Sequence, residues 1–184
     1  MYEVEYKVEI TKEERAKLVQ TLTRDGFISR DTVHQDNYYT EATKLAEGGY
    51  NIKRYRDEGK NILYTEKETE IVDGNKITKE TEREVTRAEF MKVIESGPII
   101  LKLSKDRQSW AGKYQNTTMH VDMDNVKFDH SENIRYFVEA EILVENKEEI
   151  PITKGLIIAF LKIIIEREEL VEALGMFNMA FNKK

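Results

Sequence analysis

The chain has 184 residues, and its 29 Lys and Arg against 35 Asp and Glu give a formal net charge of -6. It contains no cysteine, which excludes a disulfide framework, a thiolate zinc site, an iron–sulfur cluster and a cysteine nucleophile. The acidic balance argues against a general nucleic-acid binder, so no DNA partner is expected. The longest apolar run, residues 156–165, is too short to span a bilayer. The N-terminus also lacks the pattern of a secretory peptide, so we expect a cytoplasmic protein with no membrane partner.

Strands dominate the expected secondary structure. Residues 2–10 alternate apolar and polar side chains, which predicts a strand directly at the N-terminus. The sequence Asp73-Gly74-Asn75 is typical of a hairpin turn. Further strands are expected at residues 27–39, 49–57, 61–70, 78–85, 99–105, 107–114, 118–127 and 135–144.

Helices are expected at three places. Thr11 and Glu14 have the spacing of a capping box, which begins a helix that ends at Gly26. Thr86 and Glu89 repeat this spacing before a second, shorter helix that ends at residue 97. The last helix is expected over residues 153–174, followed by a tail over residues 175–184 whose apolar side chains pack back onto the protein.

Charged residues recur at every second position along several of the expected strands. Curling such strands into an antiparallel barrel, with amphipathic helices outside, would bring the charged faces together around a polar lumen. Arg and Lys bind phosphate oxygens and carboxylates hold divalent ions, so such a lumen suits a polyphosphate. The alternative is a sheet whose charged face simply contacts water. The pairs are Glu3/Glu5/Lys7, Arg54/Arg56, Glu80/Glu82/Glu84, Lys105/Arg107, Asp122/Asp124 and Glu139/Glu141.

These motifs, in this order, resemble those of the CYTH superfamily, the triphosphate tunnel metalloenzymes. Residues 3–7, Glu-Val-Glu-Tyr-Lys, are similar to its ExExK signature, and residues 137–141, Phe-Val-Glu-Ala-Glu, to its closing FVExE strand. Between them stand counterparts of the RxR strand (Arg54, Arg56), the hairpin lysine (Lys67), the KxR pair (Lys105, Arg107) and the strand aspartate (Asp124). Glu68 and Thr69 stand where the family often has a glycine after the hairpin lysine, which puts the identity of the substrate in doubt more than the phosphate chemistry.

The resemblance implies an α+β fold, an antiparallel β-barrel of about eight strands that forms a triphosphate tunnel, with helices packed outside. It implies a single CYTH-like domain over residues 1–184. The motifs lie in a core of residues 2–144, and residues 151–184 form the C-terminal helix and tail.

The resemblance also assigns candidate site residues. Mg²⁺ or Mn²⁺ is the expected cofactor, because hard oxygen ligands select hard cations. We expect the basic side chains to pair partly with the same glutamates in the ligand-free protein. Lys7 and Arg56 are the candidates for catalysis. The candidate phosphate-binding residues are Lys7, Arg54, Arg56, Lys67, Lys105 and Arg107, and the candidate metal ligands are Glu3, Glu5, Asp124, Glu139 and Glu141.

The activity implied is metal-dependent hydrolysis of a triphosphate, such as inorganic, thiamine or nucleoside triphosphate. One alternative is a class IV adenylyl cyclase that makes cyclic AMP and pyrophosphate from ATP. Another is a non-catalytic binder of polyphosphate or of a nucleotide. The expected partner is a small molecule that contains a triphosphate, with a homodimer as one option for assembly.

Overall fold

The computed structural model describes residues 2–45, 50–72 and 75–181. Nine strands are found in this part of the chain. They are β1 (Tyr2–Ile10), β2 (Ile28–Ser29), β3 (Val33–Lys44), β4 (Tyr50–Asp57), β5 (Ile62–Val72), β6 (Asn75–Glu84), β7 (Leu101–Tyr114), β8 (Thr117–Phe128) and β9 (Ile134–Val144). The helices are α1 (Lys12–Arg24), α2 (Arg87–Ser96), the short 3₁₀ helix η1 (Lys147–Glu149), α3 (Ile150–Ile165) and α4 (Met176–Phe181). None of these helices is long and apolar enough to cross a membrane.

The strands are joined in one sheet with the order β2-β7-β3-β4-β5-β6-β1-β9-β8. A further pairing between β7 and β8 joins the ends, so eight strands form a closed ring and β2 is an extra strand on β7. The ladders β1–β9, β2–β7, β3–β4, β4–β5 and β5–β6 are all antiparallel. The expected fold class, an α+β protein built on an antiparallel β-barrel of about eight strands, is confirmed.

The described chain divides into two compact units. Unit 1 consists of residues 1–32, 106–126 and 135–173, and unit 2 of residues 33–105, 127–134 and 174–184. Each unit is therefore assembled from segments that are far apart in the sequence. The organisation as a single domain stays a prediction.

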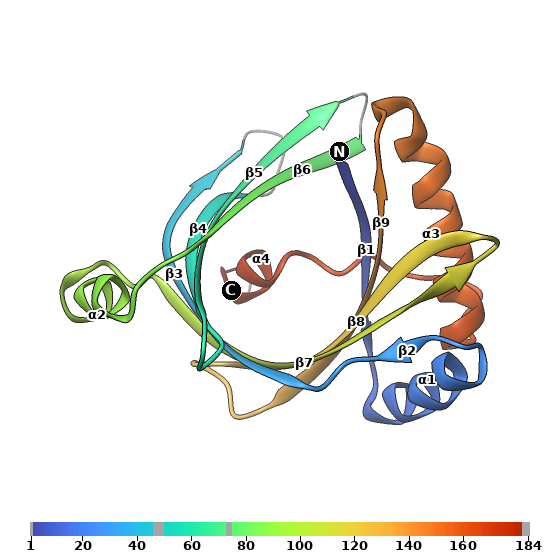
Figure 1. Ribbon diagram of the computed structural model, residues 1–184, viewed down its shortest axis with the longest axis horizontal. Helices are drawn as coiled ribbons and strands as arrows, with labels where there is room; N and C mark the ends of the chain where they lie inside the picture. The colour runs from blue at the N-terminus through green and yellow to red at the C-terminus, as the bar shows by residue number, and fades with distance from the viewer. Residues whose placement is uncertain (1, 46–49, 73–74, 182–184) are drawn as a thin grey trace. The chain divides into compact units, whose positions relative to one another are not determined.

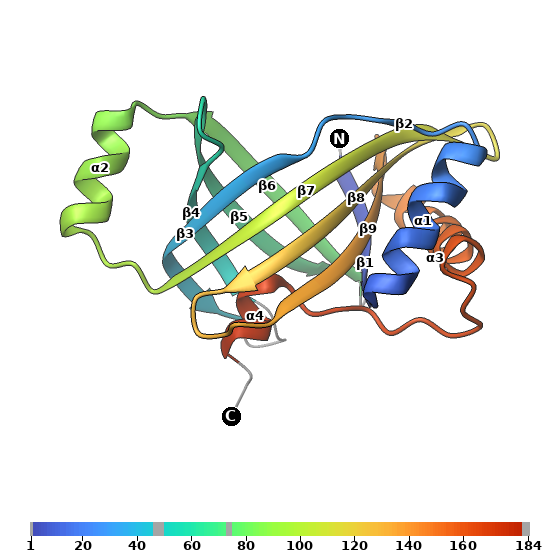
Figure 2. The same cartoon turned by 90° about the horizontal axis from the view of Figure 1, so that it is seen from below.

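Unit 1 places its apolar core on one face of β1 and β9. Along β1, Val4, Tyr6, Val8 and Ile10 are buried, because strict alternation sends these four side chains to the same face. Helices α1 and α3 lie side by side (Figure 2), and α3 packs on β1. The fully buried side chains of the two helices are Leu18, Leu22, Ile157 and Leu161. The opposite face of β1 carries Glu3, Glu5 and Lys7.

At one end of this core, the backbone of Gly112 lies close to the ring of Phe27. The Phe27 and Phe160 rings stack with centroids 5.5 Å apart. A Cβ atom at Gly112 on β7 would lie 2.5 Å from the Phe27 ring. Glycine is therefore required at this position, because any side chain would displace the aromatic pair.

Unit 2 contains the curved sheet β3–β6, whose strands run next to one another in Figure 1. Helix α2 covers one face of it, where Phe90 contacts the rings of Tyr38 and Tyr55. Tyr55, Ile62 and Phe90 form the buried core on this side. Arg54 and Arg56 flank Tyr55 on β4 and therefore project from the opposite face.

Four expectations about the elements need correction. The two strands expected at 99–105 and 107–114 form one continuous strand, β7, and the strand expected at 27–39 is divided into β2 and β3. At α2 the Glu89 amide donates to Thr86 Oγ1 at 3.1 Å, but the Glu89 carboxylate contacts Arg83 instead of closing the capping box. The expected hairpin residues Asp73 and Gly74 lie outside the described residues.

The fourth correction concerns the last long helix. It ends at Ile165 and not at residue 174, because Glu166 adopts a left-handed conformation with φ 61°. Arg167 then contacts Glu14 at the start of α1, with Nε–Oε1 and Nη2–Oε2 distances of 2.7 and 2.6 Å. The apolar run also ends at residue 165. Together with the ion pair to α1, this favours termination of α3 at Ile165. By contrast, the thirteen-residue helix α1 begins at Thr11 with both hydrogen bonds of the expected capping box.

Candidate functional site

Two groups of charged side chains stand out, one in each unit. The group in unit 1, here the acidic cluster, has six carboxylates and two cations. The group in unit 2, here the arginine cluster, has three of each. The acidic cluster consists of Glu3, Glu5, Lys7, Arg107, Asp122, Asp124, Glu139 and Glu141, and the arginine cluster of Arg54, Arg56, Glu58, Lys67, Glu80 and Glu82.

The acidic cluster is organised by the register between the first and last strands. Lys7 stands directly opposite Glu139, and Lys7 Nζ lies 3.0 Å from Glu139 Oε2. Glu5 stands directly opposite Glu141. Like charges directly opposite one another destabilise a sheet, so this arrangement has an electrostatic cost.

Arg107 on β7 contacts three carboxylates. It forms a bidentate ion pair with Asp124, in which the Nε–Oδ1 and Nη2–Oδ2 distances are both 2.8 Å. It also forms an ion pair with Asp122 and lies 3.4 Å from Glu139 Oε2. Ser109 Oγ donates to the second oxygen of Asp122 at 2.6 Å. Asp124 and Glu139 are 1% and 7% exposed, so these charges are buried and depend on their cationic partners.

Glu141 is a carboxylate of the acidic cluster with a raised pKa. Burial raises the pKa of its carboxyl, and the neighbouring charges of Asp122 and Glu139 raise it further. A hydrogen bond with Glu3 and the charge of Arg107 act in the opposite direction but do not cancel these effects. A carboxyl with a raised pKa among other carboxylates indicates a place where an additional positive charge would be stabilised.

The arginine cluster is built on β4. Residues in register on neighbouring antiparallel strands project to the same face, so Arg54, Thr65 and Glu82 form one row across β4, β5 and β6. Lys67 and Glu80 form part of the next row. Arg54 and Arg56 project about 7 Å apart along the strand, a separation that suits adjacent phosphoryl groups.

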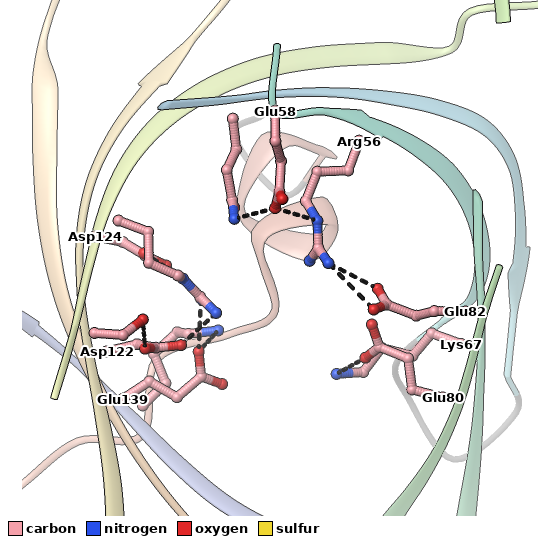
Figure 3. A network of polar contacts seen from close by, with 12 residues as sticks. Arg56, Glu58, Lys67, Glu80, Glu82, Asp122, Asp124 and Glu139 are labelled. Atoms are coloured by element: carbon pink, nitrogen blue, oxygen red, sulfur yellow. Dashed lines mark hydrogen bonds and ion pairs between the residues drawn. The ribbon is translucent and has the colours of Figure 1, made fainter. Parts of the chain in front are cut away.

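Each cation of this cluster is held by a carboxylate. Arg54 Nη2 lies 3.0 Å from Glu80 Oε1. Lys67 Nζ lies 3.6 Å from Glu80 Oε2 (Figure 3). Arg56 Nη2 contacts both oxygens of Glu82, at 3.0 and 3.2 Å. Burial alone would raise the pKa of Glu80, but the charges of Arg54 and Lys67 outweigh it and hold the pKa below its ordinary value.

An aromatic contact borders the arginine cluster. Tyr39 stands directly opposite Arg54 in the β3–β4 register. The ring of Phe177 on α4 lies 5.5 Å from the ring of Tyr39 and 5.0 Å from that of Tyr50. Phe177 and Met179 are 5% and 8% exposed, so the C-terminal segment does pack back onto the protein.

The carboxylates of the acidic cluster fit a divalent cation by their chemistry. Oxygen donors suit Mg²⁺ or Mn²⁺, and the crowding around Glu141 is the imbalance that such an ion would relieve. In the part of the chain that is described, no three His, Asp or Glu side chains are already arranged as a metal group. Instead, Asp122, Asp124 and Glu139 are held by Arg107, and Glu139 also by Lys7.

The structure groups the predicted site residues by unit. Glu3, Glu5, Lys7, Arg107, Asp124, Glu139 and Glu141 belong to the acidic cluster, and Arg54, Arg56 and Lys67 to the arginine cluster. Lys105, also in unit 2, is 6% exposed. The expected pairing of cations with predicted glutamates is confirmed for Lys7 and Arg107, both with Glu139.

Glu80, Glu82 and Asp122 belong to charged pairs noted in the sequence but were not predicted as site residues. Three further side chains with clear contacts were not predicted either. They are Glu58 and Gln35 in unit 2, and Ser109 in unit 1. Glu58 continues the every-second-residue spacing of Arg54 and Arg56, and this spacing could have identified it. Gln35 and Ser109 are neutral residues outside any charged motif, so the sequence pattern contained no signal for them.

Comparison with known protein families identifies the class of the protein. The CYTH domain model matches residues 1–172. The chain therefore belongs to the CYTH family, and the resemblance of its motifs is confirmed. The comparison with curated proteins finds no match.

Solved structures agree with this assignment at the level of the fold. The PH1819 protein from Pyrococcus horikoshii is similar with a TM-score of 0.67 and 21% identity, and all of both chains is covered. A candidate adenylate cyclase from Bacillus halodurans has a TM-score of 0.67 and 19% identity, covering 99% of this chain and 100% of that one. HpAC1 from Hippeastrum, described as an adenylyl cyclase candidate with a dominant triphosphatase activity, has a TM-score of 0.62 and 15% identity, covering 96% and 94%.

Proposed function

We propose that this protein is a divalent-metal-dependent phosphohydrolase that acts on a triphosphate. The observation that carries the proposal is the presence of two complementary clusters on one chain of the CYTH family. One has six carboxylates around two cations, with a raised pKa at Glu141, and the other has closely spaced arginines whose partners are carboxylates. A triphosphate with its metal ion requires both kinds of group.

Each cluster contains cations that can bind phosphate oxygens. Arg54 and Arg56 each offer a planar fork that matches a phosphoryl group, and Lys67, Lys105, Lys7 and Arg107 add point charges or further forks. Because phosphate oxygens carry negative charge, they can replace Glu80 and Glu82 as partners of the two arginines. Lys7 and Arg56 are the residues that we assign to the reacting phosphoryl group, where they would stabilise the charge that develops during transfer.

The carboxylates that would hold the metal are Glu3, Glu5, Asp124, Glu139 and Glu141. A bound Mg²⁺ or Mn²⁺ supplies charge neutralisation at the phosphate oxygens. The side chains themselves orient the substrate, and such positioning and electrostatic stabilisation account for most of the rate enhancement in phosphoryl transfer.

A second candidate function is that of an adenylyl cyclase, because two of the similar structures are named as candidates for that activity. The same cations would bind the triphosphate of ATP, and pyrophosphate would leave. Product analysis with inorganic, thiamine and nucleoside triphosphates, with and without Mg²⁺ or Mn²⁺, separates the functions. We expect metal-dependent release of inorganic phosphate. Cyclic AMP and pyrophosphate would establish the cyclase, and tight binding without turnover would establish a non-catalytic binder.

A further inference from the structure

Arg56 is held by two carboxylates that approach different ends of its guanidinium group (Figure 3). Glu58 Oε1 lies 3.1 Å from Nε, at the base of the group. Glu82 contacts Nη2, at its tip, through both of its oxygens. A phosphoryl group that binds the tip must therefore compete with Glu82, whereas Glu58 can remain in contact with Nε.

Glu58 is itself held in place from β3 and from the backbone of its turn. Gln35, which is 5% exposed, donates from Nε2 to Glu58 Oε1 at 2.7 Å. The Glu58 amide donates to the Asn61 carbonyl at 2.9 Å, which closes the turn between β4 and β5. The oxygen that contacts Arg56 is thus the same oxygen that the buried amide fixes.

Glu82 has the features of a partner that can be exchanged. Its side chain is 34% exposed, compared with 21% for Glu58. Thr65 Oγ1 donates to Glu82 Oε1 at 2.8 Å, and Arg54 Nη2 lies 3.9 Å from the same oxygen. Glu82 therefore keeps a hydrogen bond and a nearby cation after it leaves Arg56. Glu58 would instead lose its ion pair with Arg56 while its oxygen stayed beside the buried Gln35, and the loss of a charged partner in such a place is costly.

We propose that Gln35 and Glu58 are positioning residues that keep the Arg56 fork directed at substrate, and that Glu82 is the counterion which phosphate displaces. This inference rests on the proposed function, because it assumes that Arg56 binds a phosphoryl group. It predicts opposite consequences for the loss of two carboxylates that contact the same arginine.

The test is calorimetric titration of the full chain with inorganic triphosphate and Mg²⁺. Glu58→Gln should weaken binding about tenfold and Gln35→Leu about threefold, because Arg56 loses its fixed orientation. Glu82→Gln should make binding tighter, because a competitor for the Arg56 tip is removed. Glu41→Gln is the matched control, since Glu41 pairs with the exposed Lys53 in the same sheet, and it should have no effect.

Repeating the substitutions in an Arg56→Lys background separates positioning from general damage to the fold. If Gln35 and Glu58 act through Arg56, their loss in this background should change affinity by less than about twofold. Equal weakening by Glu58→Gln and Glu82→Gln, or full additivity with Arg56→Lys, would overturn the inference while leaving the proposed function intact. Failure of the unsubstituted protein to bind triphosphate would overturn the proposed function, and the inference with it.

Discussion

The two clusters use the same residue types to opposite electrostatic effect. In the acidic cluster six carboxylates share two cations, and burial among like charges raises the pKa of Glu141. In the arginine cluster three carboxylates match three cations, and the pKa of Glu80 is held below its ordinary value despite its burial. The first region has more carboxylates than cations, and the second has as many cations as carboxylates. This difference supports our proposal that the metal binds the carboxylates of unit 1 and that Arg54 and Arg56 of unit 2 bind phosphate.

The largest expected effect is on the acidic cluster. Glu5→Ala removes a carboxylate that stands opposite Glu141, and divalent-dependent turnover should fall by on the order of 100-fold or more because a ligand of the metal is lost. Thermal unfolding of the variant should show that the fold survives. Glu13→Ala on the exposed side of α1 is the control. Undiminished turnover in both Glu5→Ala and Glu139→Ala would contradict the proposal that the metal binds this cluster.

The next effect concerns the geometry of the arginine cluster. Arg56→Lys keeps the charge but loses the planar fork, so triphosphate binding or turnover should weaken about tenfold or more, corresponding to ~1.5–3 kcal/mol. Lys60→Arg in the neighbouring turn is the control and should change neither triphosphate binding nor turnover. Kinetics that cannot be distinguished from this control would mean that Arg56 does not bind phosphate.

The fold was easier to predict than the contacts within the clusters. The alternation in residues 2–10 and the capping box at Thr11 are local signals, and both predictions are confirmed. The opposition of Glu5 and Glu141 depends on the register between two strands separated by more than 120 residues, which no local pattern specifies. Glu58 continues the alternation of Arg54 and Arg56, but its contact with Gln35 on β3 depends on tertiary structure that no local pattern specifies.

Stability should respond to the loss of Glu80 at neutral pH. A carboxylate with a lowered folded pKa stabilises the protein above its unfolded pKa, and this contribution disappears as the pH falls through the folded pKa. Glu80→Gln should therefore reduce the free energy of unfolding by about 1–3 kcal/mol at pH 7. The difference from the unsubstituted protein should shrink in acid. Denaturant unfolding at several pH values measures it, and a constant difference would contradict the assignment.

The smallest effect has the opposite sign. Because the folded pKa of Glu141 is raised, its contribution favours the folded state when it is protonated and is lost as the pH rises through the folded pKa. Glu141→Gln should therefore raise the Tm slightly at neutral pH in metal-free buffer. A lower Tm would show that the acidic cluster is already compensated within the protein.

Calorimetric titration of Mn²⁺ alone into three proteins tests the division between the clusters most directly. The unsubstituted chain should bind Mn²⁺, Glu5→Ala should lose that binding, and Arg56→Lys should keep it unchanged. Triphosphate affinity, measured in the same variants, should fall in Arg56→Lys. Equal loss of Mn²⁺ binding in both variants, or no binding by the unsubstituted chain, would contradict the assignment of the metal to the carboxylates of unit 1.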